Sequence, residues 1–118
     1  EEIVVLPSAA RTATPTVSDY ENLECRGIKV VVDVTALTGT PSLTVKIQGK
    51  DPASGKYFDI LTSAAITATG TTVLTVYPGI TAATNSAASD VLPKKWRVLP
   101  EHANGDSITY SVGAITIK

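Results

Sequence analysis

The sequence has few of the residues that build disulfides, metal centres and membrane segments. Cys25 is the only cysteine, so no intrachain disulfide can form and a site of several thiolates is excluded within one chain. His102 is the only histidine, which excludes a centre made of several histidines from one chain. No apolar run approaches the roughly 20 residues that span a bilayer as a helix, so we expect no membrane-spanning helix.

Charge and aromatic content are also low. The 10 basic and 11 acidic residues give a net charge of −1, and the basic residues are scattered. Nucleic acids and anionic membranes are bound by clustered lysines and arginines, so we expect neither as a partner. The densest basic group consists of Lys94, Lys95 and Arg97, and we interpret it as a solvated strand face rather than an anion site. Aromatic residues make up 5% of the chain, so Val, Ile, Leu and Ala must supply most of the core.

The strongest positive signal lies in residues 28–61. In 28–36 every second residue is apolar, which places Ile28, Val30, Val32, Val34 and Ala36 on one face of a strand. In 42–48 the same period places Leu43, Val45 and Ile47 inward. Residues 49–56 combine two glycines, a proline and Asp51, which predicts a tight hairpin before the strand pattern resumes at 57–61.

Further alternating segments follow. Residues 72–77 predict a strand with Leu74 and Val76 inward, 94–98 a strand with Trp96 and Val98 inward, and 106–113 a strand with Ile108, Tyr110 and Val112 inward. We expect loops at 80–90 and 100–105, and a final short strand at Ile115 and Ile117. Together these give roughly six to eight strands, typical of an all-β antiparallel sandwich with up-and-down or Greek-key connections. Trp96 is the expected core anchor.

The first 24 residues look different from the rest. Residues 7–16 are small, polar and broken by two prolines, so we predict an extended N-terminal arm at 1–24 before a sandwich domain at 25–118. A short edge strand is expected at 14–17. The arm is either a mobile terminus or a segment that binds a neighbouring molecule. For the second case we name the apolar and basic residues of the arm as partner-binding candidates: Ile3, Val4, Val5, Leu6 and Arg11. Because the chain begins Glu1-Glu2 without methionine, we expect that leading residues have been lost or removed.

The residues that carry chemistry do not assemble into a recognisable site. His102 lies in a turn-like stretch and is interpreted as a solvated loop residue, and Cys25 as a small apolar filler rather than half of a thiol–imidazole pair with it. Asp51 and Ser54 fit turn chemistry, and their spacing does not match a calcium-binding loop. We therefore predict no catalytic residues, no cofactor and no metal, and nothing indicates an enzyme.

Much of the chain resembles a known class of proteins. Residues 31–36 (VVDVTA), 38–51 (TGTPSLTVKIQGKD), 54–57 (SGKY), 96–98 (WRV) and 107–113 (SITYSVG) resemble the small β-sandwich virion proteins of tailed bacteriophages. The resemblance implies a head decoration (cement) or minor capsid protein, located on the capsid exterior after assembly in the host cytoplasm. It implies the major capsid protein as partner and self-association, as a homotrimer.

Two other functions fit a sandwich of this size. One is a tail or neck component, which needs similar self-association. The other is a carbohydrate-binding module of a host-attachment device, which presents several aromatic residues on one exposed face. With Trp96 and Tyr110 assigned inward, the available aromatic candidates are Tyr20, Tyr57 and Tyr77.

Overall fold

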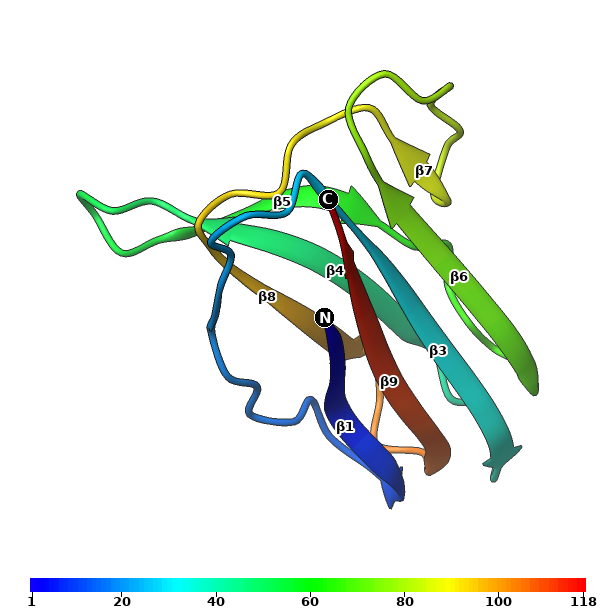
Figure 1. Ribbon diagram of the computed structural model, residues 1–118. Coiled ribbons are helices and arrows are strands. Elements are labelled where there is room, and N and C mark those ends of the chain that lie inside the picture. The colour runs from blue at the N-terminus through cyan, green and yellow to red at the C-terminus, as the bar shows by residue number, and fades with distance from the viewer.

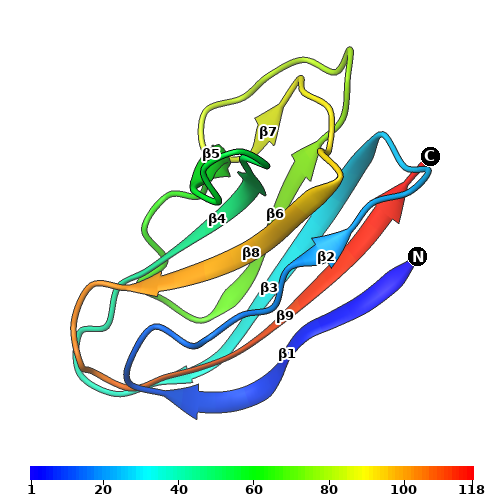
Figure 2. The same ribbon diagram turned by 90° about the vertical axis from the view of Figure 1, so that its left-hand side faces the viewer.

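The protein folds into two β-sheets packed face to face, which Figures 1 and 2 show from perpendicular directions. The structure is a computed structural model that describes residues 1–118. Its strands are β1 (Glu2–Arg11), β2 (Tyr20–Glu21), β3 (Gly27–Leu37), β4 (Leu43–Lys50), β5 (Tyr57–Thr62), β6 (Gly70–Val76), β7 (Ala87–Ala88), β8 (Lys95–His102) and β9 (Ile108–Ile117). The five-stranded sheet has the order β1-β9-β3-β6-β7 and the four-stranded sheet the order β2-β8-β4-β5. The all-β sandwich is thus confirmed.

The connections pass back and forth between the sheets. Only β4–β5 and β6–β7 are consecutive strands of one sheet, and every other connection crosses from one sheet to the other. Such crossing excludes a simple up-and-down order. All strand pairs are antiparallel except β6 with β7.

The predicted core residues of β3 and β4 lie between the two sheets. On β3 the alternate residues from Ile28 to Val34 are buried, and on β4 so are Leu43, Val45 and Ile47. The prediction for Ala36 is wrong, because this residue is exposed. The pairing of β3 with β9 shifts register between Val34 and Ala36, and a bulge of this kind turns the following side chains away from the face they would otherwise occupy.

The later strands also bury their predicted residues. Trp96 is 1% exposed and is among the largest fully buried side chains, which confirms it as a core anchor. The strand around it is longer than the sequence predicts, since residues 100–102 of the predicted loop at 100–105 continue β8. Pro100 fits there because β8 is paired on one side only at this point: Pro100 pairs with Val45 of β4, and the pairing with β2 is limited to Lys95 and Trp96. Proline lacks a backbone N–H and is tolerated where a strand has such an unpaired side. In the same way β9 runs through Gly113 without a break.

The first 24 residues do not form a separate arm. Residues 2–11 form β1, which pairs with β9 and closes one edge of the five-stranded sheet (Figure 1). Residues 14–17 contain no strand, and the next pairing is that of Tyr20 with Trp96 in the other sheet. The segment folds onto the sandwich because Ile3 and Leu6 pack against its core. Register shifts on both sides of Leu6 accommodate Pro7, which cannot donate to a regular ladder.

The β4–β5 hairpin projects from the sandwich as an ordered turn (Figure 1). Asp51 accepts hydrogen bonds from the Ala53 amide at 3.1 Å and the Ser54 hydroxyl at 2.7 Å. The bond from Ser54, followed by those from the backbone, lowers the pKa of Asp51 from its ordinary value. Gly55 has φ 73°, a left-handed conformation that favours glycine. The predicted turn chemistry is confirmed.

Candidate functional site

Of the five residues predicted to bind a partner, one is freely exposed. Ile3, Val5 and Leu6 pack against the core, whereas Val4 is 73% exposed. The guanidinium of Arg11 donates to backbone carbonyl oxygens of its own sheet, at 2.6 Å to Pro7, 3.3 Å to Ala9 and 2.7 Å to Tyr110. It also lies 4.7 Å from the centroid of the Tyr110 ring. Arg11 therefore fastens the end of β1 to β9.

Val4 belongs to an apolar row that crosses the outer face of the five-stranded sheet. Val4 pairs with Gly113 on β9, Gly113 pairs with Val31 on β3, and Val31 pairs with Val73 on β6. We call these four residues the valine row. Val73 is 43% exposed, and Ile115, two residues along β9, is 40% exposed. Large apolar side chains in register on a solvent-facing sheet are a feature of interaction surfaces.

Gly113 leaves a hollow in the middle of the row. A Cβ added at Gly113 would meet only the Ile3 carbonyl oxygen, at 4.0 Å. The resulting depression, about 200 Å³ in volume, is lined by residues of β1, β3 and β9. Lys29 and Asp33 flank Val31 on β3 and supply a polar rim. The face thus has an apolar centre with charged residues beside it, as protein interfaces commonly do.

A second surface lies where the β4–β5 hairpin meets the segment before β8. It is an open groove of about 880 Å³, which we call the hairpin groove. Its lining combines lysines, aromatic rings and prolines with two polar turn residues: Lys50, Asp51, Pro52, Ser54, Lys56, Tyr57, Phe58, Pro93, Lys94 and Lys95. An adjoining hollow of about 250 Å³ shares Lys50, Asp51, Pro52 and Lys95.

Phe58 is the exposed aromatic residue of this groove, with 48% of its surface accessible. Its ring packs beside Gly49, its partner across the hairpin. A Cβ at Gly49 would lie 2.8 Å from Phe58 Cε2 and 2.8 Å from Pro93 Cγ, so only glycine leaves room for the ring. The sequence did not single out Phe58, because alternation alone does not show that the facing residue is a glycine.

The lysines of the groove are only partly neutralised. Lys56 and Lys94 make no ion pair, and the other two pair at the surface: Lys50 with Asp19 at 3.1 Å and Lys95 with Glu21 at 3.2 Å. The Tyr57 hydroxyl donates to Asp19 at 2.7 Å, and this bond, with that from Lys50, holds the pKa of Asp19 below its usual value. Asp19 in turn raises the pKa of Lys50. The groove therefore has an excess of positive charge.

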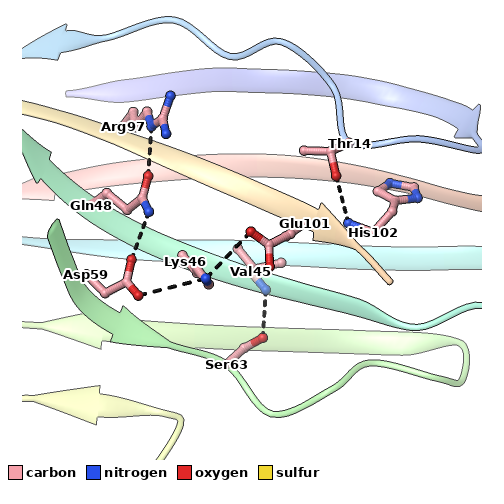
Figure 3. Close-up of polar contacts among 9 residues, drawn as sticks. All are labelled: Thr14, Val45, Lys46, Gln48, Asp59, Ser63, Arg97, Glu101 and His102. Atoms are coloured by element: carbon pink, nitrogen blue, oxygen red, sulfur yellow. Dashed lines mark hydrogen bonds and ion pairs between the residues drawn. The ribbon is translucent and has the colours of Figure 1, made fainter. Parts of the chain in front are cut away.

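The outer face of the four-stranded sheet carries a polar ladder (Figure 3). Arg97 Nε donates to Gln48 at 2.7 Å, and Gln48 donates to Asp59 at 2.8 Å. Lys46 then bridges Asp59 at 3.8 Å and Glu101 at 3.6 Å. The groups of this ladder are paired with one another. Of the predicted basic cluster, Arg97 therefore belongs to the ladder, whereas Lys94 and Lys95 line the hairpin groove.

The aromatic residues proposed for sugar stacking do not form a common platform. Arg97 covers the Tyr57 ring at 3.4 Å from its centroid. The Tyr20 ring lies against Trp96, with 4.9 Å between centroids. Tyr77 directly follows β6, and its hydroxyl donates to the Lys118 carbonyl oxygen at 2.9 Å.

His102 is part of β8 rather than a solvated loop. Its Nε2 lies 2.9 Å from the Tyr110 hydroxyl, and its backbone amide donates to Thr14 Oγ1 at 3.0 Å (Figure 3). Burial, and then the charge of Arg11, lower the pKa of His102. Burial raises the pKa of Tyr110 to about 12. These contacts hold residues 11–14 against the sandwich.

Cys25 and His102 are too far apart to act together. Cys25 lies just before the start of β3, where Gly27 pairs with Ile117. His102 contacts Tyr110, which pairs with Val34 towards the far end of β3. The separation along β3 is therefore about 20 Å or more at roughly 3.4 Å per residue. Cys25 itself is of intermediate exposure and is not part of the hydrophobic core cluster.

A search of the structure for metal-binding groups and membrane-spanning helices, and of known proteins for relatives, gives no match. No group of three or more His, Cys, Asp or Glu side chains is placed to hold a metal ion. The structure contains no helix of the length and apolarity needed to cross a membrane. Comparison with models of protein families, with curated proteins and with solved structures finds no match to this chain.

Proposed function

We propose that this chain is a non-enzymatic structural virion protein that binds the outer surface of a bacteriophage capsid and stabilises contacts between major capsid subunits. The observation that carries the proposal is the valine row, together with the resemblance of residues 31–113 to small phage virion proteins. Val4 and Val73 at the ends of the row are exposed by 73% and 43%, which leaves apolar surface for a protein partner to cover.

The size and rigidity of this face suit a repeating partner. The molecule measures 40 × 30 × 23 Å, so one sheet face can supply the roughly 800 Å² that each partner buries in a standard interface. The row lies on paired strands, so the backbone that carries it is already ordered and loses little conformational entropy on binding. A capsid repeats the same surface many times, and modest contacts become effective through that multiplicity.

The test is binding to capsids that lack the protein. We expect unmodified protein to saturate such capsids at a fixed ratio, and light scattering of the free protein to give the mass of a homotrimer. The variant Val4→Asp/Val73→Asp places two carboxylates on the row and should abolish saturation. Val91→Asp is the matched control, because Val91 is 56% exposed but lies in the loop before β8.

Two results would overturn the proposal. Saturation by Val4→Asp/Val73→Asp at the normal ratio would show that the valine row is not the docking surface. Failure of the unmodified protein to bind capsids, with binding to isolated tails or necks, would assign it to those structures instead.

A further inference from the structure

The hairpin groove has the features of a ligand site distinct from the valine row. It belongs to the four-stranded sheet, whereas the row crosses the outer face of the five-stranded sheet. Its volume of about 880 Å³ is within the range of roughly 300–1,000 Å³ typical of small-molecule pockets. Both walls include proline, Pro52 on the hairpin and Pro93 before β8, which restrict the backbone on either side.

The backbone of the hairpin has little left to offer a ligand. Two of its amide groups donate to backbone carbonyls, that of Gly55 to Asp51 at 2.9 Å and that of Asp51 to Lys56 at 2.8 Å. The Ala53 and Lys56 amides donate to side-chain oxygens of Asp51 and Ser54. A peptide that binds by adding a strand needs free main-chain groups. The available recognition groups are instead lysine ammonium groups and the exposed ring of Phe58.

We propose that the hairpin groove binds an acidic polysaccharide, one whose sugar rings carry carboxylate or sulfate groups. The apolar C–H face of a pyranose ring packs on the Phe58 ring, and the anionic substituents reach Lys56 and Lys94. These two lysines make no ion pair within the protein, so they interact with a ligand without first losing a partner. Lysine is a flexible point charge and tolerates variable spacing between anionic groups.

The charge of the groove favours a polysaccharide over nucleic acid. Nucleic acid carries closely spaced phosphates and is bound by dense basic surfaces. Here Asp51 lines the groove, and Asp19 and Glu21 neutralise two of its four lysines. Sites for single-stranded nucleic acid commonly stack successive bases on several aromatic rings, whereas this groove has one exposed ring, that of Phe58. The more widely spaced charges of an acidic polysaccharide match two unpaired lysines better.

The experiment is titration calorimetry of the full chain with defined probes. The probes are oligogalacturonate for carboxylates, a heparin fragment for sulfates, neutral dextran, oligo-dT and poly-glutamate. We expect binding of oligogalacturonate or the heparin fragment, with no binding of dextran. Lys56→Gln and Lys94→Gln should each weaken that binding by about two- to fivefold, the range of an exposed ion pair. Phe58→Leu should weaken it by about three- to tenfold, and Phe58→Tyr should retain it.

A control separates recognition from bulk charge. Lys29→Gln removes the same charge from the other sheet and should leave binding unchanged. The proposal is overturned if neither anionic saccharide binds, if Phe58→Leu binds as well as the unmodified protein, or if Lys29→Gln weakens binding as much as Lys56→Gln. Stronger binding of oligo-dT or poly-glutamate than of both saccharides would also overturn it, in favour of nucleic acid or an acidic protein segment. None of these outcomes depends on capsid binding, so the two proposals fail separately.

Discussion

Replacing Gly49 by alanine tests the packing that exposes the Phe58 ring in the hairpin groove. The added Cβ would lie 2.8 Å from Phe58 Cε2 and 2.8 Å from Pro93 Cγ, closer than side-chain contacts allow. Either the ring or Pro93 must move, and overpacking of this kind costs about 1–3 kcal/mol of unfolding free energy. We expect Gly49→Ala to destabilise the protein by about 2 kcal/mol and to weaken saccharide binding, because the ring is displaced.

The same substitution in a Phe58→Ala background separates the two obstacles. Phe58 is 48% exposed, so its truncation loses about half of the roughly 1.5–3 kcal/mol that full burial of such a side chain contributes. Without the ring, two of the three nearest obstacles to the added Cβ are gone and Pro93 remains, so Gly49→Ala should then cost about 1 kcal/mol or less. The coupling energy of about 1 kcal/mol falls in the range of roughly 0.5–3 kcal/mol for residues in contact.

Urea denaturation followed by Trp96 fluorescence measures these free energies, since Trp96 is the only tryptophan and is buried. Circular dichroism supplies a second probe. Gly105→Ala is the control, because nothing lies within 4 Å of an added Cβ at Gly105, and it should change stability by less than about 0.5 kcal/mol. The reasoning is refuted if Gly49→Ala unfolds like the unmodified protein. It is equally refuted if the cost of Gly49→Ala is the same with and without Phe58.

Three further predictions concern the N-terminal segment and the hairpin turn. Arg11→Met keeps an apolar stem but removes the bonds to three carbonyl oxygens, so the free energy of unfolding in urea should fall by about 1–3 kcal/mol. The control Arg26→Met, at an exposed position, should change it by less than about 0.5 kcal/mol. Equal effects of the two substitutions would contradict the fastening role of Arg11. The folded state lowers the pKa of His102 from 6.5 and so binds its proton less readily than the unfolded chain, and stability should fall as pH drops through 6.5 towards that lower value. His102→Gln should flatten this dependence in denaturation curves at successive pH values, and an unchanged slope would assign it to other groups. Gly55→Ala forces alanine into φ 73°, which should cost about 1–2 kcal/mol, and Gly55→Asn should cost less; a neutral Gly55→Ala would mean that the turn relaxes.

The core could be predicted from the sequence because burial and alternation coincide there. On β4 and β9 every predicted inward residue is buried, from Leu43 to Ile47 and from Ile108 to Val112. Ala36 breaks the rule because a bulge changes the face of the strand, and nothing in its immediate sequence marks that bulge.

The N-terminal strand was missed for a related reason. Its register shifts around Leu6 interrupt the period of two, and Pro7 argued against a paired strand. Ile3 and Leu6 nevertheless lie on the inner side and gain burial against the core. Within the chain, the apolar residues Ile3, Val5 and Leu6 of this stretch thus pack against the sandwich core.

The surfaces depend on pairings that the sequence does not contain. Each member of the valine row comes from a different strand, and only the registers of three strand pairs place them side by side. The hairpin groove likewise brings Lys56 beside Lys94 because β5 and β8 both flank β4. The sequence shows Lys94 and Lys95 as a basic cluster, but it does not show Lys56 as their neighbour in space.

The arrangement on two sheets has a consequence for how the surfaces respond to mutation. Val4 lies on the outer face of the five-stranded sheet, whereas Phe58 lies at the hairpin end of the four-stranded sheet, opposite Gly49. Substitutions at Val4 and Phe58 share no partner and should act independently. Val4→Asp/Val73→Asp should then remove capsid binding without changing saccharide affinity, and Phe58→Leu should do the reverse. Loss of both by one of these variants would instead point to a disturbed core, which a change in Trp96 fluorescence would reveal.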